Sequence, residues 1–151
     1  MRIVIKKAGQ PALLAVADMI QKLFAIEDDF LFDRRKVLRG LRLLLDEPKR
    51  ASIFTAQIQG IIIGMCTVQM VISTAAGGFS ARIEDVFVEN AYRKQGIGSL
   101  LLYAAERWAY GKHCCRLELV ADSRNRPALR FYQKHSFMRT RLIRLQKIMR
   151  A

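Results

Sequence analysis

Long hydrophobic runs are missing from this 151-residue chain: none reaches the roughly 20 apolar residues that a bilayer-spanning helix needs. The opening run MRIVIKKAGQPALLAVADMI is interrupted by two lysines, a glycine and a proline before residue 12. It also lacks the apolar stretch and cleavage site of a signal peptide. We therefore expect a cytoplasmic protein with no membrane partner.

Cysteine is scarce, with three residues at positions 66, 114 and 115. An odd number without metal-ligand spacing argues against a disulfide framework and against a zinc site. We expect reduced, buried thiols and no metal.

Acidic residues are also few, since 13 Asp and Glu face 26 Lys and Arg, which gives a formal net charge of +13. Such an excess suits an anionic partner: a nucleic acid, an anionic membrane surface or a phosphorylated cofactor. The basic residues are spread along the chain and are not interleaved with exposed-looking aromatics, so a nucleic-acid partner is not favoured. A hydrophobic content of 52% predicts a packed globule, and the length predicts a single domain over residues 1–151.

Hydrophobic periodicity predicts a mixed order of strands and helices. The order is strand, two helices, three strands, helix, strand, helix, and finally one or two strands over residues 137–149. A turn at residues 58–60 joins two of the strands as a hairpin. This order predicts an α/β domain whose sheet is antiparallel early and gains a parallel pair around the helix that opens at Gly96.

The stretch YRKQGIGSLLLYAAERW, residues 92–108, links a predicted strand to that helix. Amides in the first turn of a helix have no partner within the helix and carry partial positive charge. Two glycines behind two cations would therefore admit a diphosphate. The alternative is that the two glycines only permit a tight turn from strand to helix and bind no ligand. The lysine of a Walker A loop and the third small residue of a dinucleotide fingerprint are both missing.

Two segments together resemble the GNAT family of N-acetyltransferases. IEDVFVENAYRKQGIGSLLLYAAERWA is similar to the family's central motif, whose signature Gln/Arg-x-x-Gly-x-Gly/Ala is met by Arg93, Gly96 and Gly98. NRPALRFYQKHSF is similar to the family's Asn-x-x-Ala-x-x-Phe-Tyr segment, although Ser136 stands where a glycine is frequent. The resemblance extends over essentially the whole chain. It implies a single-domain GNAT fold: a mixed central sheet with flanking helices and a splayed parallel strand pair.

The resemblance implies acetyl-coenzyme A (acetyl-CoA) as co-substrate. Its pantetheine arm would pair like an extra strand with the backbone of Val86, Phe87 and Val88, where an N–H would also hold the thioester oxygen. Asn125 would contact the arm, or cap a helix, or do both. The diphosphate would lie on the backbone of Arg93, Lys94, Gln95, Gly96, Ile97, Gly98 and Ser99.

Acetyl transfer also needs a neutral amine, but an alkylammonium group has a pKa of about 10.4 and is only about 0.04% neutral at pH 7. Glu84 and Asp85 are adjacent on a predicted strand, so alternation directs them to opposite faces. The resemblance gives Glu84 the role of base, through water. Ion pairing of both acids with nearby cations is the alternative. Tyr132 is the implied acid for the thiolate, and its alternative is packing with Ala128 and Phe131.

The acceptor is indicated by IEDDFLFD, residues 26–33, which joins the first two predicted helices. The resemblance implies that this segment helps to build the acceptor pocket. Its clustered acids suit a cationic acceptor, although they also offset the adjacent basic RRK. The predicted acceptor-binding residues are Glu27, Asp28, Asp29 and Asp85.

The sequence therefore predicts an N-acetyltransferase that moves an acetyl group from acetyl-CoA to a primary amine by direct attack on the thioester. A small cationic amine is the favoured acceptor, and a peptide or protein amine is the alternative. A non-catalytic acyl-CoA-binding module is a further alternative, as is a basic nucleic-acid binder. The resemblance also allows a homodimer, because dimers are frequent among similar proteins.

Overall fold

The computed structural model describes residues 1–27 and 31–150, and its contacts divide the chain into two units, Met1–Leu119 and Val120–Ala151. The first unit contains a five-stranded sheet and three α-helices, and the second contains a fourth α-helix. This is the mixed α/β architecture that the sequence predicts. None of the helices in the described ranges has both the length and the apolar character that a bilayer span requires.

The sheet of the first unit runs in sequence order, β1-β2-β3-β4-β5. β1 to β4 pair antiparallel, and β4 pairs parallel with β5. The predicted hairpin is confirmed, because Gln59 and Gly60 both have positive φ, at 49° and 81°, as a type I′ turn requires. The strands are β1 (Ile3–Lys7), β2 (Ala51–Ile58), β3 (Ile61–Ser73), β4 (Gly78–Val88) and β5 (Arg116–Leu119).

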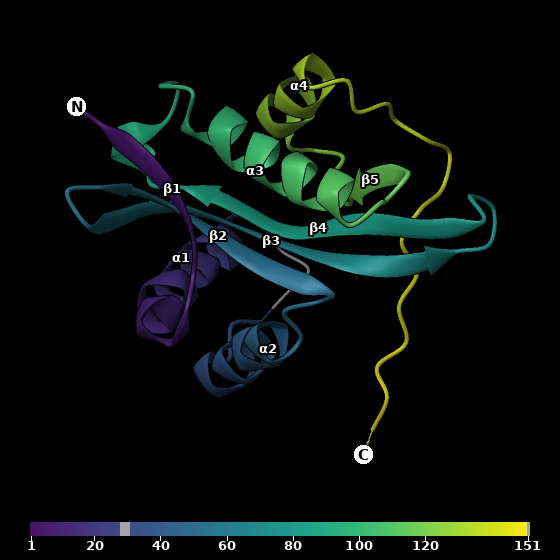
Figure 1. Ribbon diagram of the computed structural model, residues 1–151, viewed down its shortest axis with the longest axis horizontal. Coiled ribbons are helices and arrows are strands. Elements are labelled where there is room, and N and C mark those ends of the chain that lie inside the picture. The colour runs from purple at the N-terminus through teal and green to yellow at the C-terminus, as the bar shows by residue number, and fades with distance from the viewer. Residues whose placement is uncertain (28–30, 151) are drawn as a thin grey trace. The chain divides into compact units, whose positions relative to one another are not determined.

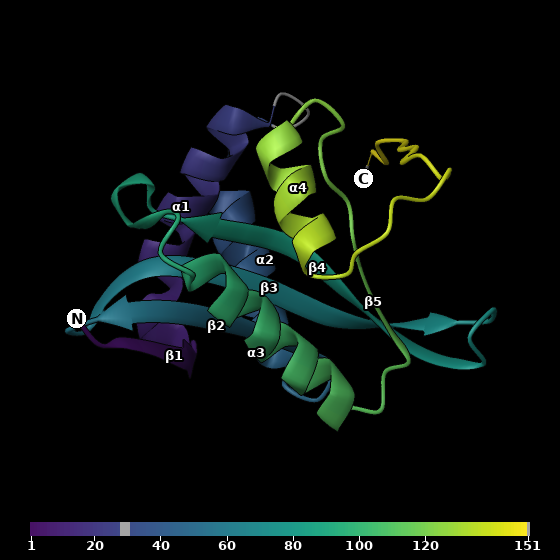
Figure 2. The same ribbon diagram turned by 90° about the horizontal axis from the view of Figure 1, so that it is seen from above.

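Helices cover both faces of this sheet. Figures 1 and 2 show α1 (Leu13–Ile26) and α2 (Arg34–Asp46) on one face and α3 (Ile97–Gly111) on the other. On the face covered by α1 and α2, a buried hydrophobic cluster forms in which α1 packs on Ile53, Met65 and Phe87. Short 3₁₀ turns precede α1 at Gln10–Ala12 and follow β4 at Asn90–Tyr92.

Gly64 of β3 lets α3 lie close to the sheet. A Cβ at this position would approach the carbonyl oxygen of Phe87 to 3.1 Å and the side chain of Leu101 to 3.2 Å. Both distances are tighter than ordinary van der Waals contact, so a larger residue would push α3 outward. The start of α3 and the end of β4 are therefore held at a fixed separation.

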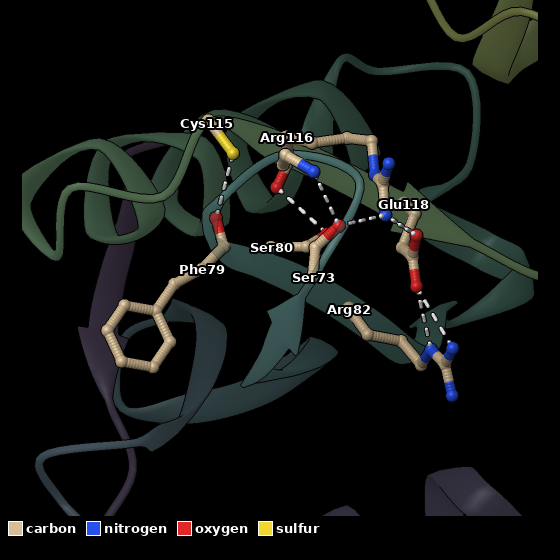
Figure 3. A network of polar contacts seen from close by, with 8 residues as sticks. Ser73, Phe79, Ser80, Arg82, Cys115, Arg116 and Glu118 are labelled. Atoms are coloured by element: carbon tan, nitrogen blue, oxygen red, sulfur yellow. Dashed lines mark hydrogen bonds and ion pairs between the residues drawn. The ribbon is translucent and has the colours of Figure 1, made fainter.

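A polar network ties β4 to β5 where the two strands run in parallel (Figure 3). One oxygen of Glu118 accepts from Arg82 at 2.9 Å, and the other lies 3.2 Å from Arg116. The hydroxyl of Ser80 donates to the Arg116 carbonyl at 3.4 Å. Such half-exposed ion pairs contribute little stability each, about 0–1 kcal/mol, but the Arg82–Glu118 pair joins residues that face each other across the two strands.

The second unit contains α4 (Arg126–Lys134), which begins as predicted. Asn125 Oδ1 accepts the Ala128 N–H at 3.2 Å, and a proline lies in the first turn. Ser136 has φ +66°, a left-handed conformation that glycine adopts at lower cost, so the departure from the family pattern falls on a strained turn.

The prediction of one or two closing strands over residues 137–149 is wrong. Residues 137–150 form no strand in the part of the chain that the structure describes. Alternating apolar and basic residues favour a strand, but a strand is stable only when another strand supplies the ladder of hydrogen bonds.

Candidate functional site

A β-bulge shapes β4 at the two carboxylates that the sequence singles out. Thr67 of β3 lies opposite Asp85, while the next residue, Val68, lies opposite Ile83, so Glu84 is an extra residue in the ladder. Side-chain alternation fails at a bulge. The prediction that Glu84 and Asp85 lie on opposite faces, which rests on alternation, therefore remains a prediction, and the charge of Glu84 raises the pKa of Asp85.

Asp85 is half-buried, whereas Glu84 is exposed. Burial is the main cause that raises the pKa of the Asp85 carboxyl group to about 6; a hydrogen bond from Thr67 opposes that rise, and the charge of Glu84 adds to it. A carboxyl group with a pKa close to neutral is suited to accept a proton near neutral pH.

Thr67 is a site residue that sequence reasoning missed. Its hydroxyl lies 2.8 Å from Asp85 Oδ2 and 3.1 Å from the Asp85 backbone nitrogen, and the side chain is 1% exposed. The available signal was a single threonine in the middle of the apolar run IIIGMCTVQMVI, which predicts a buried hydroxyl that needs a polar partner.

The end of β4 has one edge that faces away from β3. The ladder with β5 covers only Ser80–Ile83, and the strands of the described residues pair Asp85–Val88 with β3 alone. The N–H of Glu89 donates to the Ile63 carbonyl at 2.8 Å, so by alternation the backbone groups of Phe87 also point to β3. Those of Val86 and Val88 point to the open edge.

The structure thus separates the three residues predicted to pair with the pantetheine arm. Val86 and Val88 direct backbone groups outward, whereas Phe87 directs its carbonyl toward Gly64 of β3 and buries its ring in the core. Phe87 therefore packs in the core, and its backbone groups face β3 and not the open edge of β4.

The start of α3 has the backbone geometry expected of an anion site. Gly96 is the N-cap residue with φ +81° and no side-chain cap, and the Leu100 N–H makes the first intrahelical bond, to the Gly96 carbonyl at 3.1 Å. The amides of Ile97 and Gly98 precede that bond in the first turn, where partial positive charge gathers. Lys94 also has positive φ, 60°, and left-handed residues next to helical ones form anion-binding concavities.

Arg93 and Lys94, the two predicted cations, differ in their contacts. Arg93 Nε donates to the Val88 carbonyl at 2.9 Å, and its guanidinium lies 5.3 Å from the centroid of the Phe87 ring. Arg93 therefore fastens the loop before α3 to the end of β4. Lys94 is exposed, and the Gln95 amide donates to the Ala91 carbonyl at 3.3 Å.

In the second unit, Tyr132 is packed among aromatic rings. Its ring centroid lies 5.3 Å from that of Phe131 and 5.8 Å from that of Phe137, and its carbonyl accepts the N–H groups of His135 and Phe137. The roles predicted for Tyr132 and Asn125 toward the donor remain predictions.

The acidic segment before α2 is only partly described. Glu27 is half-buried at the end of α1, and Asp28 and Asp29 lie outside the described residues. Asp33, a fourth acid of this cluster, is the N-cap of α2: its carboxylate accepts the N–H groups of Arg35 and Lys36 at 3.0 and 3.1 Å. Part of the acidic cluster therefore serves the helix.

The three cysteines differ in exposure. Cys66 is buried as predicted, Cys114 is half-buried, and Cys115 is exposed, so the prediction of buried thiols is wrong for Cys115. Burial and, to a lesser extent, the charge of Asp85 raise the pKa of the Cys66 thiol, which keeps it protonated. Within the described ranges, no cluster of His, Cys, Asp and Glu could hold a metal ion.

The acetyltransferase (GNAT) family matches residues 17–137, and the chain belongs to this family. A stretch of 58 residues is 45% identical to streptothricin acetyltransferase A of Bacillus subtilis (strain 168). That match covers 38% of this chain and 34% of the relative, about a third of its length.

Solved structures share the fold. A transcriptional regulator from Bacillus halodurans C-125 has a TM-score of 0.83 at 24% identity, covering 98% of this chain and 100% of its own. The aminoglycoside N-acetyltransferase AAC(6')-Iy, solved in complex with CoA, has a TM-score of 0.84 at 19% identity. The match covers 97% of this chain and 95% of that protein. At these identities the likeness concerns the fold.

Proposed function

We propose that this protein is an acetyl-CoA-dependent N-acetyltransferase that acts on a primary amine, a small cationic acceptor. The observation that carries the proposal is the pairing of two features in the first unit. The open edge of β4 at Val86 and Val88 is suited to an extended arm, and Arg93 joins it to the glycine-capped start of α3, which is suited to a diphosphate. Membership of the GNAT family supports this reading.

The donor would be held mainly by backbone groups. The diphosphate would lie over the loop 93–99, with the amides of Ile97 and Gly98 as donors and Lys94 as the nearby cation. Because Arg93 already holds the Val88 carbonyl, the arm would use the N–H of Val88 and the backbone groups of Val86. One such N–H would also stabilise the oxygen of the thioester, an interaction typically worth about 3 kcal/mol in the transition state.

The reaction would proceed by direct attack. The neutral amine nitrogen forms a bond to the thioester carbon, the carbon–sulfur bond breaks, and the acetyl group ends on nitrogen as an amide. Glu84, the exposed carboxylate of the bulge, accepts the proton of the amine through water. Tyr132 donates a proton to the departing thiolate, and Asn125 contacts the arm.

A small cationic amine is the acceptor that the acids of this site suit best. Glu27 and Asp85 are the described members of the predicted acceptor set, and both are half-buried. The names of a streptothricin acetyltransferase and an aminoglycoside N-acetyltransferase among the similar proteins support an acceptor of this kind. The test is incubation with acetyl-CoA and a panel of amines, followed by measurement of free thiol.

Glu84→Gln is expected to lower kcat/KM most at low pH, and high pH is expected to restore part of the loss. Without a base, the reaction depends on amine that is already neutral, and that fraction rises tenfold per pH unit below a pKa of about 10.4. The measurement is a pH profile of kcat/KM for an amine found in the panel. The matched control is Glu106→Gln, the same change at an exposed acid of α3. Equal rates and parallel profiles for wild type and Glu84→Gln would assign proton removal to Asp85 or to bulk water.

A further inference from the structure

The hydroxyl of Thr67 makes two hydrogen bonds to the same residue across the bulge. A hydroxyl has one proton to donate and lone pairs that accept. Its proton goes to Asp85 Oδ2 at 2.8 Å, and its oxygen accepts the Asp85 N–H at 3.1 Å. One buried group therefore fixes both the main chain and the carboxylate of Asp85.

The bulge explains why the hydroxyl is needed. The extra residue, Glu84, disrupts the ladder locally, so the Asp85 N–H bonds to a side chain of β3 in place of a backbone carbonyl. A buried N–H without a partner would cost about 1–3 kcal/mol. Valine has nearly the shape of threonine but cannot replace either hydrogen bond.

The charged groups around Asp85 do not stabilise its carboxylate, which makes the hydrogen bond from Thr67 more important. Glu84 of β4 is a like charge, and Cys66 of β3 stays a neutral thiol. The charged residues of α1, which packs against β4, are engaged elsewhere: Asp18 with Arg34 at 2.7 Å and Lys22 with Glu89 at 2.6 Å. In the described part of the chain no ion pair joins Asp85 to a cation, so Thr67 is the neighbour that favours its ionised form.

We propose that Thr67 is a positioning residue for acetyl transfer: its hydroxyl fixes the Asp85 carboxylate at the bulge, so that Asp85 acts together with Glu84 as the acceptor for the proton of the amine. This inference rests on the proposed function, because it deepens the assignment of the base in that same site. The proton leaves the amine nitrogen as the N–C bond forms, is shared by the pair, and passes to solvent before the next turnover.

The sign of the effect follows from the ionisation of Asp85. Its carboxyl group accepts a proton only when ionised, so activity falls as the pH drops through the pKa of Asp85. The hydrogen bond from Thr67 lowers the pKa of Asp85. Removing the hydroxyl therefore raises that pKa further and moves the acid side of the rate profile to higher pH.

The experiment compares pH profiles of kcat/KM for matched variants. Thr67→Val is expected to shift the acid limb of the profile to higher pH by roughly 0.5–1 unit. At a given pH on that limb, kcat/KM then falls by about 3- to 10-fold. Thr67→Ser, which keeps a hydroxyl, is expected to restore the wild-type profile. The control is Thr55→Val in β2, an equally buried threonine whose hydroxyl lies near the Lys6 carbonyl and the Gln57 amide and contacts no carboxylate. An unshifted profile in Thr67→Val, or a matching shift in Thr55→Val, would overturn the proposal.

A second readout separates this inference from the proposed function. Titration of the Asp85 carboxyl carbon by NMR, assigned with Asp85→Asn, needs no turnover. The pKa of Asp85 is expected to rise in Thr67→Val and to return in Thr67→Ser; an unchanged pKa contradicts the role of Thr67. Wild-type protein that acetylates no amine would contradict the proposed function instead. If Thr67→Val does not fold, Thr67→Ala removes the same hydroxyl with less crowding and is read in the same way.

Discussion

Gly98→Asp is expected to abolish the thermal stabilisation that acetyl-CoA gives to the wild-type protein. Gly98 lies in the first turn of α3, beside the amides proposed to receive the diphosphate. A carboxylate there would occupy the phosphate position and repel the donor. Repulsion between two unit charges at 4 Å is about 4 kcal/mol at an effective dielectric constant of 20, or roughly 1000-fold in affinity.

The same substitution should preserve the fold. An acidic side chain in the first turn interacts favourably with the helix dipole, by about 0.3–1 kcal/mol. The measurement is the melting temperature as acetyl-CoA is added. At a concentration 100 times Kd, the wild-type protein gains about 2.7 kcal/mol, which is a rise of roughly 5–10 °C for a chain of this size.

Two variants control for the added atoms and for the added charge. Gly98→Ala adds a methyl group without charge and is expected to retain most of the stabilisation. Gly40→Asp makes the same chemical change on α2, at an exposed position where a Cβ meets nothing within 4 Å, and is expected to bind as wild type does. Folded Gly98→Asp protein that binds acetyl-CoA as tightly as wild type would refute the assignment of the diphosphate site.

Tyr132→Phe is expected to lower turnover by about 10- to 1000-fold, a loss of roughly 1.4–4 kcal/mol in the transition state. The change removes one hydroxyl and keeps the ring, so the contacts with Phe131 and Phe137 should persist and the fold should survive. Affinity for acetyl-CoA should change much less, because the hydroxyl acts on the departing thiolate.

The measurement for Tyr132→Phe is turnover and donor affinity on the same purified protein. Tyr103→Phe supplies the matched control, since Tyr103 is 58% exposed on α3 and has no proposed contact with the reaction. Turnover unchanged by Tyr132→Phe would make Tyr132 a packing residue and would mean that the thiolate leaves without an acid.

Local patterns in the sequence were sufficient for most of the elements. The helical spacing from Leu13 to Phe24 predicts α1, and the β-branched runs around Gly60 predict the hairpin of β2 and β3. The left-handed Gly96 and the cap at Asn125 follow from residue types whose backbone preferences are strong by themselves.

Features set by contacts distant in sequence could not be predicted in this way. The bulge at Glu84 depends on how β3 and β4 align, so alternation within β4 alone could not reveal it. The bond from Arg93 to the Val88 carbonyl joins a loop to the end of a strand, which no local pattern shows, and the role of Arg93 toward the diphosphate remains a prediction. The strand pattern of residues 137–149 was misleading because a strand needs a partner, which the pattern does not supply.

The measurement that tests the central claim most directly is a screen of amines with acetyl-CoA, in which free thiol and the mass of the acetylated product are recorded together. Polyamines, aminoglycosides, streptothricin, and peptides with a free N-terminus or lysine form the panel, and Gly98→Asp protein is the control. We predict thiol release coupled to acetylation of at least one small cationic amine by the wild-type protein, and none by the control. Binding of acetyl-CoA without acetylation of any amine would contradict the account and indicate an acyl-CoA-binding module, and acetylation of peptides alone would contradict the proposed acceptor.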